Sequence, residues 1–192
     1  MTEPNNPNSM ILDEGNEADV IDFDTIVDIL ESNKILESLD ETEFMSRFQP
    51  YFDTLGAQHC EAREFTSLGA SHAGVHRCTG TNSYPDESLW GSLKLLVPTL
   101  DAIREELGHS IRLSSIYRAP QYNSCVGGKD ASQHLKFTAA DCVVRNARPM
   151  ALHEAALNVR ARGEFKGGIG LYNSFVHIDV RGENVDWSKI SA

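Results

Sequence analysis

Long apolar segments are missing from this sequence. A membrane-spanning helix needs about 18 or more consecutive apolar residues, and no uninterrupted apolar run approaches that length. The N-terminus, MTEPNNPNSM, has neither the basic region nor the apolar region of a signal peptide. We therefore expect a protein without a membrane partner that stays in the cytoplasm after synthesis.

Closely spaced cysteine pairs are also missing. The chain has four cysteines, Cys60, Cys78, Cys125 and Cys142, and none of them forms a C-x-x-C pair with another. This spacing argues against a thiolate zinc site and against a thioredoxin-like redox motif. Cys78 and Cys125 are candidates for pairing, but cytoplasmic thiols are kept reduced, so we expect all four thiols to be free.

Basic residues are almost absent from the first 43 positions. This stretch holds 13 acidic residues and one basic residue, Lys34, whereas the other 149 residues hold 15 acidic and 16 basic residues. The net charge of −11 therefore belongs to an acidic N-terminal arm, residues 1–43, and the single domain expected over residues 44–192 is close to neutral. No basic stripe of the kind that follows nucleic-acid phosphates is present, so nucleic acid is a poor candidate partner.

The arm has two parts. Residues 1–20 are polar and acidic, with too few large apolar groups to offset the entropy of folding, so we expect them to be disordered. From Asp22 onward apolar residues recur at helical spacing, which predicts an acidic amphipathic helix that ends before about Asp40. This helix either docks on its own domain with a solvated acidic face, which the pattern favours, or docks on a larger assembly.

The rest of the chain mixes strands and helices, and its clearest strand pair is antiparallel, which predicts an α+β fold with a small antiparallel sheet and flanking helices. The domain proper is expected to begin near Phe48 and to be rich in loops as far as Pro85. Gly108 should end the first helix of the domain, and Pro98 should kink or split it. The predicted helices cover residues 88–107, a short turn around Tyr122 and residues 149–162. The predicted strands cover residues 111–115 and 139–144, and a hairpin of residues 169–172 and 175–181.

Three polar residues in the second half of the chain have the spacing of a metal site. His134 follows Ser132 in a short S-x-H motif, Asp141 comes seven residues later, and His177 lies on the second strand of the predicted hairpin. Two histidine nitrogens and one carboxylate, with a fourth position left for water, are a recurring catalytic zinc arrangement. Each feature alone is weak, because a seven-residue gap between His and Asp often arises by chance and a histidine on a strand is more often structural.

The surrounding sequence resembles the zinc peptidases of the D-alanyl-D-alanine carboxypeptidase type, peptidase family M15, and especially their short branch, subfamily A. The resemblance rests on SSIYRAPQYNSCVGGKDASQHLKFTAADCVV (residues 114–144) and GGIGLYNSFVHIDVRG (residues 167–182). It is supported upstream by EFTSLGASHAG, CTGTN and LWGSLKLLVPTLDAIREELG. It covers roughly residues 64–187, about two thirds of the chain, and implies a zinc peptidase domain like those of hedgehog proteins and D-Ala-D-Ala peptidases.

The resemblance implies one zinc ion per chain, held by His134, Asp141 and His177. Zinc lowers the pKa of water bound to it and polarises a peptide carbonyl. Family members place a Glu or Asp, or an H-x-H motif, a few residues before the last ligand to supply a general base, but residues 172–175 contain no carboxylate. Asp179 is then the best base within reach. Its rival role is to accept a hydrogen bond from a ligating imidazole or from Arg181, and the sequence is consistent with both roles.

The resemblance also implies substrate contacts at Ser115, Tyr117, Arg118 and Ser132. Arg118 belongs to the Ser-x-Tyr-Arg motif and is implied to lie near the substrate carboxylate or the scissile carbonyl, since guanidinium can grip a carboxylate with two parallel hydrogen bonds. Taken alone, Arg118 is more typical of a structural ion pair and Tyr117 of a core residue with a polar tip, and the resemblance makes a substrate contact of Arg118 equally compatible with the sequence. The two tryptophans, Trp90 and Trp187, are interpreted as core and C-terminal packing residues.

The expected activity is cleavage of peptidoglycan stem peptides or muropeptides that contain D-amino acids. The bond is D-Ala-D-Ala, L-Ala-D-Glu or a cross-link, and the sequence does not indicate which. A bacteriophage lysis or virion protein fits a wall hydrolase without a signal peptide, and so does a cytoplasmic enzyme that recycles muropeptides. The alternative function, motivated by the missing upstream carboxylate, is a non-catalytic zinc-binding domain with a structural or interaction role. Nothing in the sequence indicates an oligomeric state.

Overall fold

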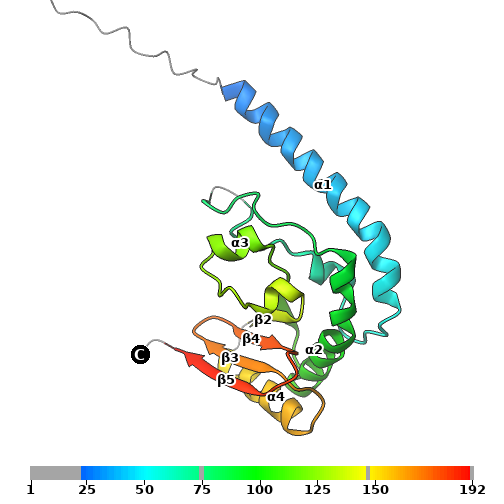
Figure 1. The fold of residues 1–192 in the computed structure, drawn as a ribbon, viewed down its shortest axis with the longest axis vertical. Helices are drawn as coiled ribbons and strands as arrows, with labels where there is room; N and C mark the ends of the chain where they lie inside the picture. The colour runs from blue at the N-terminus through cyan, green and yellow to red at the C-terminus, as the bar shows by residue number, and fades with distance from the viewer. Residues whose placement is uncertain (1–22, 74–75, 146–147, 191–192) are drawn as a thin grey trace, which may run out of the picture. The chain divides into compact units, whose positions relative to one another are not determined.

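The computed structural model describes residues 23–73, 76–145 and 148–190 (Figure 1). The disorder expected for residues 1–20 lies outside this range. The chain divides into two compact units, Met1–Asp40 and Glu41–Ala192, and the elements discussed below belong to the second unit except for the first part of helix α1. None of the described helices is long and apolar enough to cross a membrane.

Helix α1 spans Phe23–Asp53, so the prediction that it ends before about Asp40 is wrong. The reason lies in three phenylalanines, Phe44, Phe48 and Phe52, which recur every four residues and are all buried. The rings of Phe44 and Phe48 both pack against Trp90, so tertiary contacts carry the helix beyond the acidic stretch and through Pro50. Among the residues whose side chains the structure describes, Phe44 is the first that belongs to the buried core of the domain.

The sheet has five strands in the order β1-β2-β4-β3-β5, which confirms the α+β prediction. All neighbouring strands pair antiparallel except β3 and β5, which pair parallel. The strands are β1 (Ile111–Ser115), β2 (Ala139–Val144), β3 (Gly168–Tyr172), β4 (Val176–Asp179) and β5 (Val185–Lys189). The first four match the predicted strands closely.

The edge strand β5 was not predicted, although its sequence VDWSK alternates apolar and polar residues as a half-buried strand does. The strand is short and mostly exposed, so it has few apolar residues from which a strand could be predicted. Its pairing places Val185 and Trp187 on one face of the sheet and Asp186 on the other, where Asp186 forms an ion pair with Arg160.

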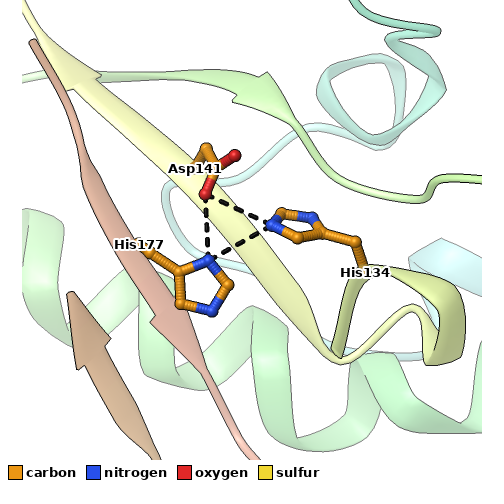
Figure 2. Close-up of side chains that lie close together, drawn as sticks. All are labelled: His134, Asp141 and His177. Atoms are coloured by element: carbon orange, nitrogen blue, oxygen red, sulfur yellow. Dashed lines mark hydrogen bonds and ion pairs between the residues drawn. The ribbon is translucent and has the colours of Figure 1, made fainter. Parts of the chain in front are cut away.

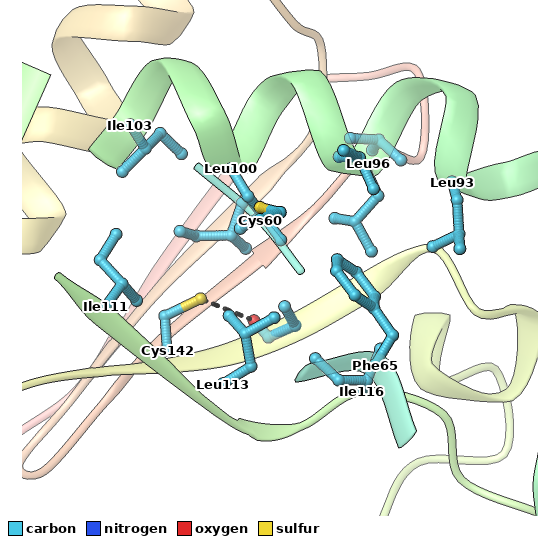
Figure 3. Close-up of a cluster of buried hydrophobic side chains, with 14 of the residues drawn as sticks. Cys60, Phe65, Leu93, Leu96, Leu100, Ile103, Ile111, Leu113, Ile116 and Cys142 are labelled. Carbon is cyan, nitrogen blue, oxygen red and sulfur yellow. Dashed lines mark hydrogen bonds between the residues drawn. The ribbon is translucent and has the colours of Figure 1, made fainter. Parts of the chain in front are cut away.

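Helices α2 (Leu93–Leu107) and α4 (Pro149–Ala161) pack together on one face of the sheet (Figure 1). Gly108 ends α2 with a left-handed backbone, as expected, but α2 continues through Pro98 and the break in the predicted helix falls after Ser92. Between α2 and the strands lies the apolar core, which contains Leu96 and Leu100 (Figure 3). The shorter helices are η1 (Ala62–Thr66), η2 (Glu87–Ser92), α3 (Pro120–Cys125) and η3 (Gln133–Lys136).

Cys78 and Cys125 form a disulfide, which corrects the expectation of four free thiols. The two residues are 47 positions apart, and the bond ties the loop before η2 to the last residue of α3. The expectation rested on the redox state of the cytoplasm, whereas the fold brings the two Cα atoms to 5.8 Å, a separation that suits a disulfide. Cys60 and Cys142 are free and buried.

Candidate metal centre

The face of the sheet opposite α2 and α4 carries the predicted site. Strand register places Ser115 beside Asp141, Asp141 beside His177, His177 beside Gly170, and Gly170 beside Trp187. Directly paired residues project to the same face of a sheet. These residues therefore form one row across all five strands, on the face that the helices leave open.

Three side chains converge at the middle of this row (Figure 2). Oδ1 of Asp141 lies 3.2 Å from Nε2 of His134 and 2.9 Å from Nδ1 of His177, and the two histidine nitrogens are 3.2 Å apart. All three residues are buried. Each therefore offers one ligand atom to a common point, and the group could hold a metal ion.

His134 reaches this point from η3, the short helix before β2. The hydroxyl of Ser132 caps this helix by accepting a hydrogen bond from the His134 backbone N–H, and Phe137 ends it with a φ of 58°. The imidazole Nδ1 lies 2.6 Å from the carbonyl oxygen of Ile116. A carbonyl only accepts, so Nδ1 carries the proton and Nε2 presents its lone pair to Asp141 and His177.

His177 is oriented in the same manner by Asp179, two residues further along β4. Nε2 of His177 lies 3.1 Å from Oδ2 of Asp179, so Nε2 donates and Nδ1 is left with a lone pair for a metal. Asp179 is fully buried and also accepts hydrogen bonds from the backbone N–H of Gly168 and from the guanidinium of Arg181. It lies on the far side of the imidazole from the point where the ligand atoms converge. This placement favours the supporting role for Asp179 over that of general base.

Arg118 fixes the third ligand. Its Nη2 forms an ion pair with Oδ2 of Asp141, and its Nε donates to the hydroxyl of Ser115 at 2.8 Å. Its backbone N–H donates to the carbonyl of His134. These contacts leave Oδ1 of Asp141 turned toward the histidines. The sequence did not reveal that Arg118 contacts a metal-site residue, because the contact joins a loop to a strand 23 positions away.

The protonation states of the buried carboxylates and histidines favour the binding of a cation. Burial raises the pKa of the Asp141 carboxyl, but the two histidines outweigh it and hold that pKa well below its usual range. Burial opposes ionisation of Asp179 too, but the hydrogen bond with His177 helps to keep its pKa low. Burial lowers the pKa of His134, whereas at His177 the carboxylates of Asp141 and Asp179 outweigh burial and raise the pKa, so a metal bound at Nδ1 of His177 would displace a proton from that nitrogen. Both carboxylates are thus charged at neutral pH, and His134 is neutral, the form that binds metals.

The chain was compared with known protein families and with curated proteins. The family model for Peptidase M15 matches residues 59–179, more than half of the chain, and the match contains His134, Asp141 and His177. The chain belongs to the peptidase M15 family. No curated protein matches it. Family membership points to a metallopeptidase, and it confirms the family predicted from the motifs, while the assignment to subfamily A stays a prediction.

A cavity of about 570 Å³ opens over the metal-site residues of this M15 peptidase domain. Of the four predicted substrate contacts, Ser115, Arg118 and Ser132 line it. Tyr117 does not line it: its ring packs edge-on against Phe137 of the core, as its alternative interpretation holds.

Several residues that line the cavity were not predicted. Lys129, Arg181 and Lys189 add positive charge to that of Arg118, and Asp141 is the sole carboxylate among the described lining residues. Tyr172 and Trp187 form an aromatic part of the wall, which corrects the interpretation of Trp187 as a packing residue alone. Once β5 is recognised as a strand, the alternation of VDWSK predicts that the Trp187 side chain lies on the same face of the sheet as the metal-site residues.

Proposed function

We propose that this domain is a zinc-dependent peptidase that cleaves peptidoglycan peptides containing D-amino acids. The observation that carries the proposal is the convergence of Nε2 of His134, Oδ1 of Asp141 and Nδ1 of His177 in a domain of the M15 family. Two neutral imidazoles and one carboxylate are the ligands of many catalytic zinc sites. The tautomers fixed by Ile116 and Asp179 leave both ligand lone pairs directed at the same point.

His134, Asp141 and His177 would hold the zinc, which when bound supplies a Lewis acid that polarises the scissile carbonyl and lowers the pKa of water. The protein's own side chains orient the metal ligands and the substrate. Arg118 holds the Asp141 carboxylate, and its Nη1 makes no hydrogen bond within the described part of the chain, so it is available to a substrate carbonyl or carboxylate. Asp179 acts through His177, whose ring it holds in place.

The cavity suits an anionic peptide. Lys129 and Lys189 line it and are exposed, and the Asp141 carboxylate already interacts with Arg118 and the two histidines. Peptidoglycan stem peptides carry free carboxylates, which these cations would attract. The proposed substrates are stem peptides or muropeptides, with D-Ala-D-Ala, L-Ala-D-Glu or a cross-link as the cleaved bond.

The test is mass spectrometry of muropeptides after incubation with the zinc-loaded protein, with a chelated sample as control. Cleavage that the chelator abolishes supports the proposal, and the product masses identify the bond. The His134→Ala variant serves as a second control, because it removes one ligand and should abolish cleavage. Cleavage that survives both the chelator and His134→Ala would show that the activity does not come from this site.

A second function has one observation in its favour. Asp141 is the only carboxylate among the described residues that line the cavity, and it is engaged by Arg118, so no free carboxylate stands ready to accept a proton. A zinc-binding domain with a structural or interaction role needs no such group. Zinc binding at one ion per chain together with intact muropeptides would favour this second function.

A further inference from the structure

Trp187 lies in the row of residues that contains the metal site, although it is outside the residues that match the family model. It is on the edge strand β5, directly beside Gly170 of β3, and Gly170 is directly beside His177 of β4. The strand between Trp187 and His177 therefore presents no side chain at this position. The indole lies across that gap and lines the cavity.

Glycines on β3 make this arrangement possible. A Cβ atom at Gly170 would lie 2.3 Å from Cε2 of the indole, and one at Gly168 would lie 3.0 Å from Cζ3. Carbon atoms in contact need about 3.5 Å or more, so a side chain at Gly170 would displace the indole. With glycine there, the ring centroids of Trp187 and His177 are 5.2 Å apart, with the planes tilted by 45°. This is the spacing of an aromatic contact.

His177, Asp179, Arg181 and Trp187 form a ring of contacts in which each residue touches the next and Trp187 touches His177 again. His177 donates to Asp179, Asp179 accepts from Arg181, and the guanidinium of Arg181 lies 5.6 Å from the centre of the Trp187 ring, which in turn packs against His177. The indole N–H donates to the hydroxyl of Tyr172 at 3.1 Å, which fixes the ring's rotation. The His177 ring is thus held at its edge by Asp179 and beside its face by Trp187.

We propose that Trp187 is a positioning residue for the metal centre, which keeps the His177 imidazole turned so that Nδ1 faces His134 and Asp141. Strand β5 then contributes a residue to the site, although it lies beyond residues 59–179, which match the family model. This inference rests on the proposed metal site and adds a residue to it. The competing explanation is that Trp187 only secures the edge strand, in which case any loosening of β5 would have the same effect.

The experiment measures zinc affinity directly, by competition with a chromogenic chelator, for the full chain and three variants. Trp187→Leu removes the ring beside His177 and should weaken zinc binding by about tenfold or more, as loss of a residue that orients a ligand does. Trp187→Phe keeps an aromatic face but loses the hydrogen bond to Tyr172, and it should retain most of the affinity. Asp186→Ala loosens the same strand from its other face by removing the ion pair with Arg160, and it should bind zinc like the parent.

Each outcome decides between the explanations, provided that circular dichroism shows each variant folded at the assay temperature. A folded Trp187→Leu variant that binds zinc as tightly as the parent overturns the positioning role, and so does an Asp186→Ala variant that loses as much affinity. If Trp187→Leu does not fold, Gly170→Ala replaces it, because the added Cβ displaces the indole without removing it; unchanged affinity there also overturns the role. A parent protein that binds no zinc contradicts the proposed function as well.

Discussion

Replacing Asp179 with Asn separates the two roles that the sequence left open for this residue. The substitution keeps the size of the side chain but removes its charge. In the parent, the carboxylate accepts hydrogen bonds from His177, from the Gly168 backbone and from Arg181, all in a fully buried position. The amide retains one acceptor oxygen and presents an NH₂ group in place of the other, so at least one donor loses its partner.

The size of the effect follows from these contacts. Removing one partner of a buried ion pair costs about 3 to 5 kcal/mol of unfolding free energy, but the Arg181 side chain is 24% exposed and regains part of this from water. We therefore expect a loss of about 2 to 3 kcal/mol in the metal-free protein. The His177 ring loses the acceptor that orients it, so zinc affinity should fall by about 10- to 100-fold.

The assay combines urea unfolding of the metal-free protein, zinc competition and muropeptide hydrolysis at saturating zinc. Asp186→Asn is the matched control: the Asp186 side chain is 56% exposed, although that of its partner Arg160 is buried, so the substitution should cost less than Asp179→Asn, about 1 kcal/mol, and leave zinc affinity unchanged. The supporting role predicts that Asp179→Asn recovers most of its activity once zinc saturates it. Unchanged zinc affinity with hydrolysis reduced by orders of magnitude would refute our reasoning and identify Asp179 as the general base.

Other features of the fold give further predictions. Burial raises the pKa of the Cys60 and Cys142 thiols well above the usual range, so iodoacetamide should modify no cysteine in the native protein, two after unfolding without reductant and four after reduction, as counted by mass spectrometry. A different count in the unreduced sample would contradict the disulfide. Replacing both Cys78 and Cys125 with Ser opens a loop of 47 positions and should lower the unfolding free energy by up to about 4 kcal/mol in urea titrations; an unchanged midpoint would argue against the cross-link. Phe48→Ala should cost about 3 to 5 kcal/mol, whereas a loss below about 1 kcal/mol would mean that this part of α1 does not pack on the domain.

The metal-site residues could be predicted from the sequence because the motifs around them resemble those of the M15 family, and local structure helps to fix their positions. His134 and Asp141 are joined by one short helix and the first residues of a strand, and His177 lies on a strand whose alternation shows which face it occupies. The structure brings the three together as the motif indicates. What remained open was the role of Asp179, because the choice depends on which nitrogen of His177 faces inward, and only the three-dimensional arrangement determines that.

The features that were missed depend on contacts between distant segments. Helix α1 continues past its acidic stretch because Phe44 and Phe48 pack on Trp90, more than 40 positions away along the chain. The disulfide depends on where α3 places Cys125. Trp187 reaches the site only because β5 pairs parallel with β3 and Gly170 leaves room for the indole. Composition and periodicity describe each segment by itself, so they could at most suggest the cysteine pair as a candidate and could not establish any of these contacts.

The most direct test of the account is a zinc titration of the metal-free protein in which bound zinc and muropeptide hydrolysis are measured in the same samples. The account predicts that hydrolysis rises in proportion to occupancy and reaches its plateau at one zinc per chain. It also predicts that Asp141→Ala shows neither tight binding nor cleavage, because this variant removes the ligand that contacts both histidines. Full occupancy without any cleavage, or cleavage that does not depend on occupancy, would contradict the account.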